Sequence, residues 1–382
     1  MKETYIIDAV RTPRARRKGK FSTVHPVDLL TYPLNAIVNR NNLEPKEIED
    51  VAIGCVTQTT EQAWCVARNA ILAAGWPITV PGVTINRLCA SGLQACNFIS
   101  NSIKSGNYSL AIAGGLEHMT RVPMFSDTGG EESSLLKKFH PNLVDQGRAC
   151  ELLVDHFKIS RDDINRFALR SQIKAKEAKL NKKFSKSLIP IPYHDENNQE
   201  QILDFDDNPR PETTIEALNS LKTVFKEDGT ITAGNASAIV DGAATVLFAN
   251  ENKIQELNLK PRARVVASAV IGSDPLIMLS GPIEASKLAL KKANLRLEDI
   301  DIWEINEAFA PVVLATVNTL GIDMNKVNVN GGAIALGHPL GATGAILLGT
   351  ALDELEFQQK RYALITLCIG LGMGVATIIE RI

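Results

Sequence analysis

The stretch Val83–Gly92, VTINRLCASG, passes from a short β-rich run through a polar loop into a helical pattern. A second stretch of this kind, Val327–Asn330 (VNVN), also leads through a loop into a helical pattern. Apolar runs of similar length alternate with amphipathic segments along most of the chain. The expected strands are Tyr5–Val10, Asp50–Gly54, Val83–Ile85, Leu110–Ala113, Arg264–Ile271, Asp301–Glu304, Val327–Val329 and Ala363–Cys368, and the expected helices are Pro26–Arg40, Ser91–Ser105 and Pro282–Ala293. This alternation predicts an α/β fold with largely buried sheets.

Two further pairs of similar segments occur in the same order at the two ends of the chain. The segment from Asn42 to Gly54 resembles the one from Asn294 to Glu304, and Tyr108–Ile112 resembles Tyr362–Thr366. Three matches in the same order predict a duplicated α/β unit, although similar segments can also occur in an α/β protein without duplication. Between the halves, residues 118–239 are rich in charges and turn formers, with one basic amphipathic helix expected at Arg161–Asn181. This segment is expected to fold over the core as a substrate lid or arm.

Composition limits the possible classes of protein. The chain has 382 residues, of which 45% are hydrophobic, and its formal net charge is −2. Two or three domains are expected for this length. The hydrophobic content excludes intrinsic disorder, and the near-zero charge argues against general nucleic-acid binding.

The six cysteines do not form a metal or disulfide framework. None lies in a C-x-x-C pair and no H-E-x-x-H occurs, so neither a zinc site nor a bound metal is expected. Acidic residues Glu3 and Asp8 near the amino terminus favour a first strand over an export signal, which predicts a cytoplasmic protein with reduced thiols. The uncharged stretch Ala363–Ile379 is interrupted by glycines, so two strands with a tight turn are expected there, and no membrane segment.

Cys89 is the first candidate for chemistry, because it lies between an expected strand and the start of an expected helix. Helix amino termini favour thiolates, and Arg87 could add to this effect. The alternative is a buried structural cysteine, which is the usual state of a free thiol and is expected for Cys96.

Three more segments carry candidate residues. His338 lies in a glycine-rich loop, NGGAIALGHPLGATG, that would be the counterpart of the Cys89 loop in a duplicated fold. Cys368 ends a strand and precedes Gly370, whose backbone could hold an oxyanion; the glycines there open no helix, so a nucleotide fingerprint is excluded. Asn306 follows an expected strand and is either a site residue or a helix cap.

A run of six basic residues occurs between Arg11 and Lys20. Such runs are usually solvated loops. The more specific alternative is that this run binds an acidic partner or a nucleotide phosphate.

These residues together resemble the active-site blocks of the thiolase family. The matching blocks, in order, are NRLCASG at 86–92, AGNAS at 233–237, NEAF at 306–309, GHP at 337–339 and C-x-G at 368–370. Other segments are most similar to the 3-ketoacyl-CoA thiolases of the bacterial fatty acid oxidation complex: GCVTQTTEQ at 54–62, ARNA at 67–70, EHM at 117–119 and RPETT at 210–214. One departure is Leu279-Ser280 after Met278, where the family usually has glycine, which leaves the local turn geometry open.

The resemblance implies a duplicated five-layered αβαβα core with an inserted loop domain. The amino-terminal half would comprise residues 1–117 and 240–261, the inserted domain residues 118–239, and the carboxy-terminal half residues 262–382. It also implies cleavage of a 3-oxoacyl-CoA by CoA, with CoA as a substrate and no cofactor. An acetoacetyl-CoA thiolase is the first alternative, and a non-catalytic acyl-CoA-binding protein of the same fold is the second.

The resemblance further implies a role for each site residue. Cys89 would be the nucleophile that carries the acyl group, His338 its base, and Cys368 the acid and base for the second half-reaction. Asn306 would hold a water near the enolate, and Gly370 would donate to the oxyanion. The residues implied in CoA binding are Arg210, Ala233, Ser237 and Phe309. A homodimer or homotetramer is expected, as is a complex with a hydratase-dehydrogenase subunit, for which the Arg11–Lys20 run is a candidate contact.

Overall fold

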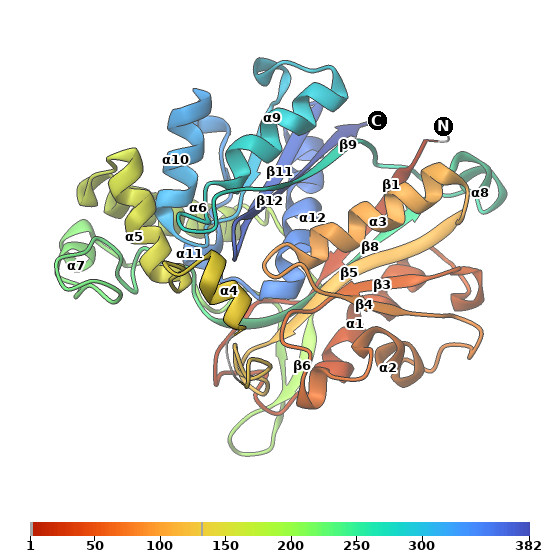
Figure 1. Ribbon diagram of the computed structural model, residues 1–382. Helices are drawn as coiled ribbons and strands as arrows, with labels where there is room; N and C mark the ends of the chain where they lie inside the picture. Colours follow the sequence, from red (N-terminus) through yellow and green to blue (C-terminus); the bar gives the residue numbers. More distant parts are fainter. Residues whose placement is uncertain (1–2, 131–132) are drawn as a thin grey trace.

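The computed structural model describes residues 3–130 and 133–382. Residues 1–2 and 131–132, which fall in the predicted first half and inserted domain, lie outside this part. One continuous strand order, β10-β11-β12-β9-β1-β8-β5-β3-β4, runs through the molecule. Its middle joint, β1 with β9, consists of two residue pairs, Tyr5–Arg264 and Ile6–Ala263. Because β1 and β9 pair over so short a length, the strands form two sheets, one for each half of the chain (Figure 1).

The two sheets repeat one pattern of strands. The first contains β1 (Tyr5–Arg11), β3 (Val51–Gly54), β4 (Val83–Ile85), β5 (Leu110–His118) and β8 (Val240–Ala249), and the second contains β9 (Ala263–Gly272), β10 (Ile302–Ile305), β11 (Tyr362–Ile369) and β12 (Met373–Arg381). β3 pairs with β5 in parallel, as β10 pairs with β11. The next two pairs in each sheet are antiparallel: β5–β8 and β8–β1 in the first, β11–β12 and β12–β9 in the second. The predicted duplication is therefore visible in the pairing.

The expected strand Val327–Val329 is wrong in its extent. Val327 forms a single parallel bridge with Trp303, in the place that β4 occupies beside β3 in the first sheet. The next residue, Asn328, has φ of 45°, a left-handed conformation that ends an extended segment. Its side-chain amide instead exchanges two 2.8 Å hydrogen bonds with the backbone of Ile305. A polar side chain thus takes over the pairing that the rest of a strand would have made.

Helices complete five layers around the two sheets. α1 (Pro26–Arg40) and α2 (Val66–Ala73) cover one sheet, α9 (Gly281–Ala293) covers the other, and α10 (Ala310–Leu320) packs beside α9 in the same core. α3 (Ser91–Ser105) and α12 (Leu340–Gln358) lie between the sheets, and α12 contacts strands of both. Residues Leu340–Leu355 of α12 are all buried, which explains why apolar residues are not confined to one side of this helix. The α/β class and the five-layered core are therefore confirmed.

The segment between β5 and β8 forms its own small elements. They are α4 (Ser134–Phe139), α5 (Gln146–Phe157), α6 (Arg161–Leu180), β6 (Ile191–His194), β7 (Glu200–Leu203) and α7 (Ile215–Asn219). α5 and α6 pack against α10, and α6 also packs against the short helix α11 (Ala333–Leu336). The helices of this segment therefore lie against the second half of the chain, next to α11, whereas β6 and β7 pack into the core of the first half (Figure 1). Two short elements remain, β2 (Ala15–Arg16) beside β8 and α8 (Glu251–Glu256).

The uncharged stretch near the carboxy terminus forms a hairpin. β11 and β12 pair antiparallel over eight residue pairs, from Tyr362–Glu380 to Ile369–Met373. The turn between them has positive φ at Leu371 and Gly372. In the part of the chain that the structure describes, no helix is both long and apolar enough to cross a membrane.

The basic run between Arg11 and Lys20 is neither a fully solvated loop nor one continuous patch. Arg11 and Arg14 are buried, and both pair with the buried carboxylate of Asp206, at 2.7 Å and 3.1 Å. Arg16 pairs with β8 as part of β2, and its side chain is exposed. The two buried arginines are thus not available to a partner, because they hold the segment at Asp206 against the first sheet.

The unusual segment at Met278–Ser280 needs no glycine. Met278 and Leu279 are buried in the core under α9, and Ser280 lies just before this helix with φ of −80°. Neither Leu279 nor Ser280 has a positive φ. The departure from the family pattern therefore adds apolar packing without backbone strain.

Candidate active site

Cys89 lies in the tight loop that connects β4 to α3. The side chain of Asn86 accepts a hydrogen bond from Leu88 N at 2.8 Å, and Ser91 Oγ accepts one from Arg87 N at 2.8 Å. Leu88 has φ of 46°, which turns the chain sharply before Cys89. These local bonds fix the loop, and the Cys89 side chain is left only 6% exposed.

Burial decides the protonation state of Cys89. Loss of solvation raises the pKa of its thiol to about 11, although the Gln146 side chain and the backbone amides of Cys89 and Gly370 act in the opposite direction. The expectation that the helix terminus and Arg87 would favour the thiolate is therefore wrong for the resting protein. Cys89 is a neutral thiol, which would need a base in order to act as a nucleophile.

His338 has the geometry and the charge of such a base. Its Nδ1 lies 2.6 Å from Thr343 Oγ1, and Thr343 Oγ1 lies 2.9 Å from Pro339 O one turn earlier. Since the single hydroxyl proton goes to the Pro339 carbonyl, the Thr343 oxygen accepts from Nδ1–H. Nε2 then keeps its lone pair, and Asn306 Nδ2 lies 3.3 Å from it. Burial lowers the pKa of His338 to about 3, so the imidazole is neutral.

Cys368 and Gly370 approach the nucleophile from the end of β11. Burial raises the pKa of Cys368 well above its usual value, and the charge of a Cys89 thiolate would raise it further, which places the two sulfurs near each other. The Gly370 backbone amide reaches the Cys89 thiol. The position of Gly370 against the Leu88 side chain completes this contact between the hairpin turn and the nucleophile loop.

The amino termini of α3 and α12 meet face to face, which brings the Cys89 and His338 loops together. A Cβ atom on Gly92 would lie 2.6 Å from Gly341 O, so this approach requires glycine. Leu340, two residues after His338, packs in one cluster with Cys89. The structure thus gathers all five predicted catalytic residues at the seam between the halves: Cys89, His338, Cys368, Asn306 and Gly370.

A buried carboxylate beneath this seam was not expected from the sequence. Glu117, at the end of β5, accepts hydrogen bonds from Val56 N (3.0 Å), Thr57 N (3.2 Å), Gln62 Nε2 (3.0 Å) and Gly341 N (2.9 Å). Burial raises its pKa, and these four donors oppose the rise. Gly341 follows the His338 loop, and Val56 packs beside Cys89. The hydrogen bonds that Glu117 accepts from both residues therefore hold the two loops next to each other.

The residues expected to bind CoA lie at a different edge of the site. Arg210 and Ala233 line one cavity of about 160 Å³. Ser237 N donates to Ala308 O at 2.9 Å, and Phe309 forms a bridge with the residue before Ser237. The two segments are thus bonded to each other, and Phe309 joins this edge to the strand end that carries Asn306.

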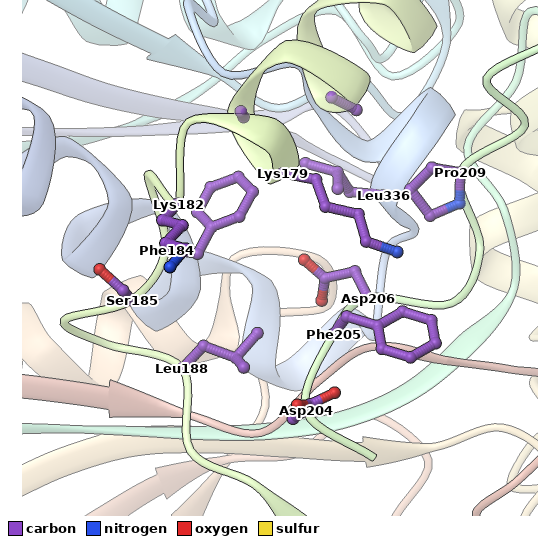
Figure 2. A pocket seen from close by; sticks show the side chains of 12 residues that line it. Lys179, Lys182, Phe184, Ser185, Leu188, Asp204, Phe205, Asp206, Pro209 and Leu336 are labelled. Atoms are coloured by element: carbon purple, nitrogen blue, oxygen red, sulfur yellow. The ribbon is translucent and has the colours of Figure 1, made fainter.

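A larger cavity lies apart from these residues. It has a volume of about 290 Å³, and Figure 2 shows Phe184, Phe205 and the side chains of Lys179 and Lys182 around it, with Leu336 of α11 at its wall. In the described part of the chain, none of the nine predicted site residues contributes to its lining. We therefore assign it no part in the chemistry.

Comparison with known proteins gives a consistent result. Residues 4–252 match the thiolase amino-terminal domain and residues 259–381 match the thiolase carboxy-terminal domain. The chain is 43% identical to the 3-ketoacyl-CoA thiolases of Klebsiella pneumoniae and of Escherichia coli over the full length of each. It is similar to the crystal structures of Bacillus anthracis acetyl-CoA acetyltransferase (TM-score 0.92) and human mitochondrial 3-ketoacyl-CoA thiolase (TM-score 0.91). Both are 37% identical to it, and each alignment covers 100% of this chain and 99% of the other.

Proposed function

Because the chain belongs to the thiolase family and is therefore an acyltransferase, we propose that it cleaves 3-oxoacyl-CoA with CoA, as a 3-ketoacyl-CoA thiolase of fatty acid β-oxidation. The products are acetyl-CoA and an acyl-CoA two carbons shorter. The observation that carries the proposal is that the loops of Cys89 and His338 meet at one seam with a second thiol, Cys368, and that both Cys89 and His338 are neutral there. Two thiols and one base match the needs of two successive acyl transfers.

In the first half-reaction, His338 Nε2 takes the proton of Cys89 as its sulfur attacks the 3-keto carbon. The bond between C2 and C3 then breaks, which leaves a thioester on Cys89 and the enolate of acetyl-CoA. Cys368 gives its proton to that enolate, and His338 with a water held by Asn306 stabilises the enolate oxygen. Asn306 Oδ1 supports this role, because it is buried and has no hydrogen-bond partner in the described structure.

In the second half-reaction, the Cys368 thiolate takes the thiol proton of incoming CoA. The CoA sulfur attacks the thioester, and the backbone amides of Cys89 and Gly370 hold the oxyanion. Cys89 leaves as a thiolate and recovers its proton from His338, so the enzyme returns to its starting state. Arg210, Ala233, Ser237 and Phe309 line the path of CoA in this proposal.

Mass spectrometry of the protein mixed with a 3-oxoacyl-CoA tests the nucleophile. An acyl adduct is expected on Cys89, and none is expected in Cys89→Ser. Cys96→Ser is the matched control, since Cys96 is a second buried thiol on the next helix and should leave the adduct unchanged. An adduct that persists on another thiol in Cys89→Ser would refute the assignment.

The second candidate is an acetoacetyl-CoA thiolase, because the chain is also similar in structure to the acetyl-CoA acetyltransferase of Bacillus anthracis. Both activities use the same chemistry, so the rate of thiolysis across acyl chain lengths separates them. The wall beside Cys89 contains Val56, Met119 and Leu340, which suits an aliphatic chain. We expect chains of six carbons or more to react efficiently, whereas a steep preference for four carbons would favour the alternative.

We also propose that the protein acts in the cytoplasm as a homodimer or homotetramer. A reducing compartment is required because oxidation of Cys89 or Cys368 would stop the reaction. The outermost strand β4 supports self-association, since Val83 on it is half exposed and Ile78 and Trp64 nearby are largely exposed. Sedimentation of the purified chain tests this. Co-purification from its host tests the further proposal of a hydratase-dehydrogenase partner.

A further inference from the structure

We infer that Gln146 is a further catalytic residue of this site, whose carboxamide donates a hydrogen bond to the sulfur of Cys89 once the proton has left. The inference rests on the proposed function, since it concerns the same nucleophile. Gln146 belongs to the segment between β5 and β8, and none of the motifs in the sequence includes it.

The side chain of Gln146 is poised beside the sulfur without a partner of its own. It lies close enough to lower the pKa of the Cys89 thiol, yet its Nε2 is buried and has no hydrogen-bond partner within the described structure. Native proteins rarely leave a buried donor unpaired, because the lost solvation of that donor destabilises the fold. A neutral thiol is a weak acceptor, whereas a thiolate is a charged and strong one. The Cys89 thiolate that forms during the reaction therefore supplies the acceptor that the Gln146 carboxamide lacks.

Helix α5 presents one face to both catalytic sulfurs. Gln146 reaches Cys89, and Cys150, one turn further along, lies near enough to Cys368 for their charges to interact. Residues four apart lie on the same side of a helix. Cys150 and Cys368 also belong to one buried cluster, so α5 lies next to both sulfurs.

The orientation of Gln146 is fixed by its surroundings. Asp145 caps α5 and accepts 3.0 Å hydrogen bonds from Gly147 N and Arg148 N. Gly147 packs so closely on Phe225 that a Cβ there would lie 2.2 Å from its ring. One turn later, Glu151 accepts hydrogen bonds from the backbone of residues 230 and 231 at 2.8–2.9 Å. The carboxamide is therefore held in place and needs little reorganisation when charge develops.

The apolar side chains that pack with Cys89 cannot stabilise a charge on its sulfur. Val56, Met119 and Leu340 pack with Cys89 and are apolar. Two backbone amides, of Cys89 itself and of Gly370, also reach the sulfur. In such an environment a third donor, supplied by a side chain, has a large effect on the thiolate.

Alkylation of Cys89 by iodoacetamide measures this effect without turnover. Gln146→Met keeps the length of the side chain and removes the donor. We expect alkylation at pH 8 to slow by about 10- to 100-fold, as a lost hydrogen bond to a charged group predicts. Gln146→Glu replaces the donor with a negative charge and should slow alkylation at least as much. Gln94→Met is the matched control, because Gln94 is a buried amide on α3 with an unpaired Oε1, and it should change the rate less than threefold.

The results separate this inference from the proposed function. If Gln146→Met is alkylated at the wild-type rate, the inference is refuted, whether or not thiolysis occurs. If no 3-oxoacyl-CoA is cleaved by the wild type while alkylation still depends on Gln146, the proposed function fails and the inference stands. Gln146→Glu provides the same comparison should Gln146→Met not fold, as judged by its thermal unfolding.

Discussion

Replacement of Thr343 by valine tests the assignment of His338 as the base. Thr343 Oγ1 accepts a hydrogen bond from His338 Nδ1–H at 2.6 Å and donates its own hydroxyl proton in a hydrogen bond to Pro339 O at 2.9 Å. Valine has nearly the same shape but neither accepts nor donates. The imidazole would then have a buried N–H without a partner, or would move the proton to Nε2 and lose its basic lone pair.

The magnitude follows from the cost of that unpaired group. A buried donor without an acceptor costs about 1–3 kcal/mol. At 1.4 kcal/mol for each factor of ten, acylation of Cys89 should slow by about 5- to 150-fold. The KM for 3-oxoacyl-CoA should change little, because Thr343 is 2% exposed and lies behind the ring.

Single-turnover acylation, followed by quenching and mass spectrometry, gives the rate directly. Thr350→Val is the matched control, since Thr350 lies on the same helix and makes the same bond to the carbonyl one turn earlier, at 2.9 Å to Ile346 O. Thr343→Ser retains the hydroxyl and should recover most of the rate. If Thr343→Val loses no more activity than Thr350→Val, the role of Thr343 and the proton placement on His338 are both wrong.

Three further predictions concern pH and buried charge. Because His338 has a pKa of about 3 and Cys89 of about 11, the acylation rate should stay level from pH 5.5 to 8.5, and a twofold fall at pH 6.5 in stopped-flow measurements would contradict this. Asp206→Asn should lower the free energy of unfolding in urea at pH 7 by about 3–5 kcal/mol, since it leaves two buried arginines unpaired. The two arginines depress the pKa of Asp206, so this contribution is present above the unfolded value of about 3.9 and is lost below it; wild type and variant should therefore converge as the pH falls below about 4. Glu117→Gln places an amide against backbone donors and should lower kcat at least tenfold with a reduced Tm, whereas Glu47→Gln at a surface ion pair should change neither.

Local patterns in the sequence predict most of the fold. The helices Pro26–Arg40 and Ser91–Ser105 occur with the expected bounds, because their apolar spacing and terminal residues are local properties. The strand at Val327–Val329 fails for an equally local reason, the left-handed Asn328, yet an asparagine in an apolar run does not reveal which conformation it will take. The strand order across the two halves depends on pairings far apart in the sequence, and only the repeat of similar segments points to it.

Some residues of the candidate site can be predicted from the sequence, and others cannot. Cys89, His338 and Cys368 can be found from the loops and strand ends that carry them. Glu117 and Gln146 cannot, because their importance comes from contacts with residues more than fifty positions away. The protonation of Cys89 was predicted wrongly from its place at a helix terminus, since the depth of burial that outweighs the helix dipole belongs to the tertiary structure.

Burial also explains why the site needs contributions from three parts of the chain. Burying a neutral thiol and a neutral imidazole where water is excluded costs little free energy. Proton transfer from the thiol to the imidazole, however, creates a thiolate and an imidazolium in the same place. Cys89 comes from the first half, His338 and Gly370 from the second, and Gln146 from the segment between them, so the donors surround the sulfur from several directions. The low dielectric that opposes the thiolate strengthens each of these hydrogen bonds. Removal of any one donor should therefore slow acylation far more than removal of an equivalent bond at the surface.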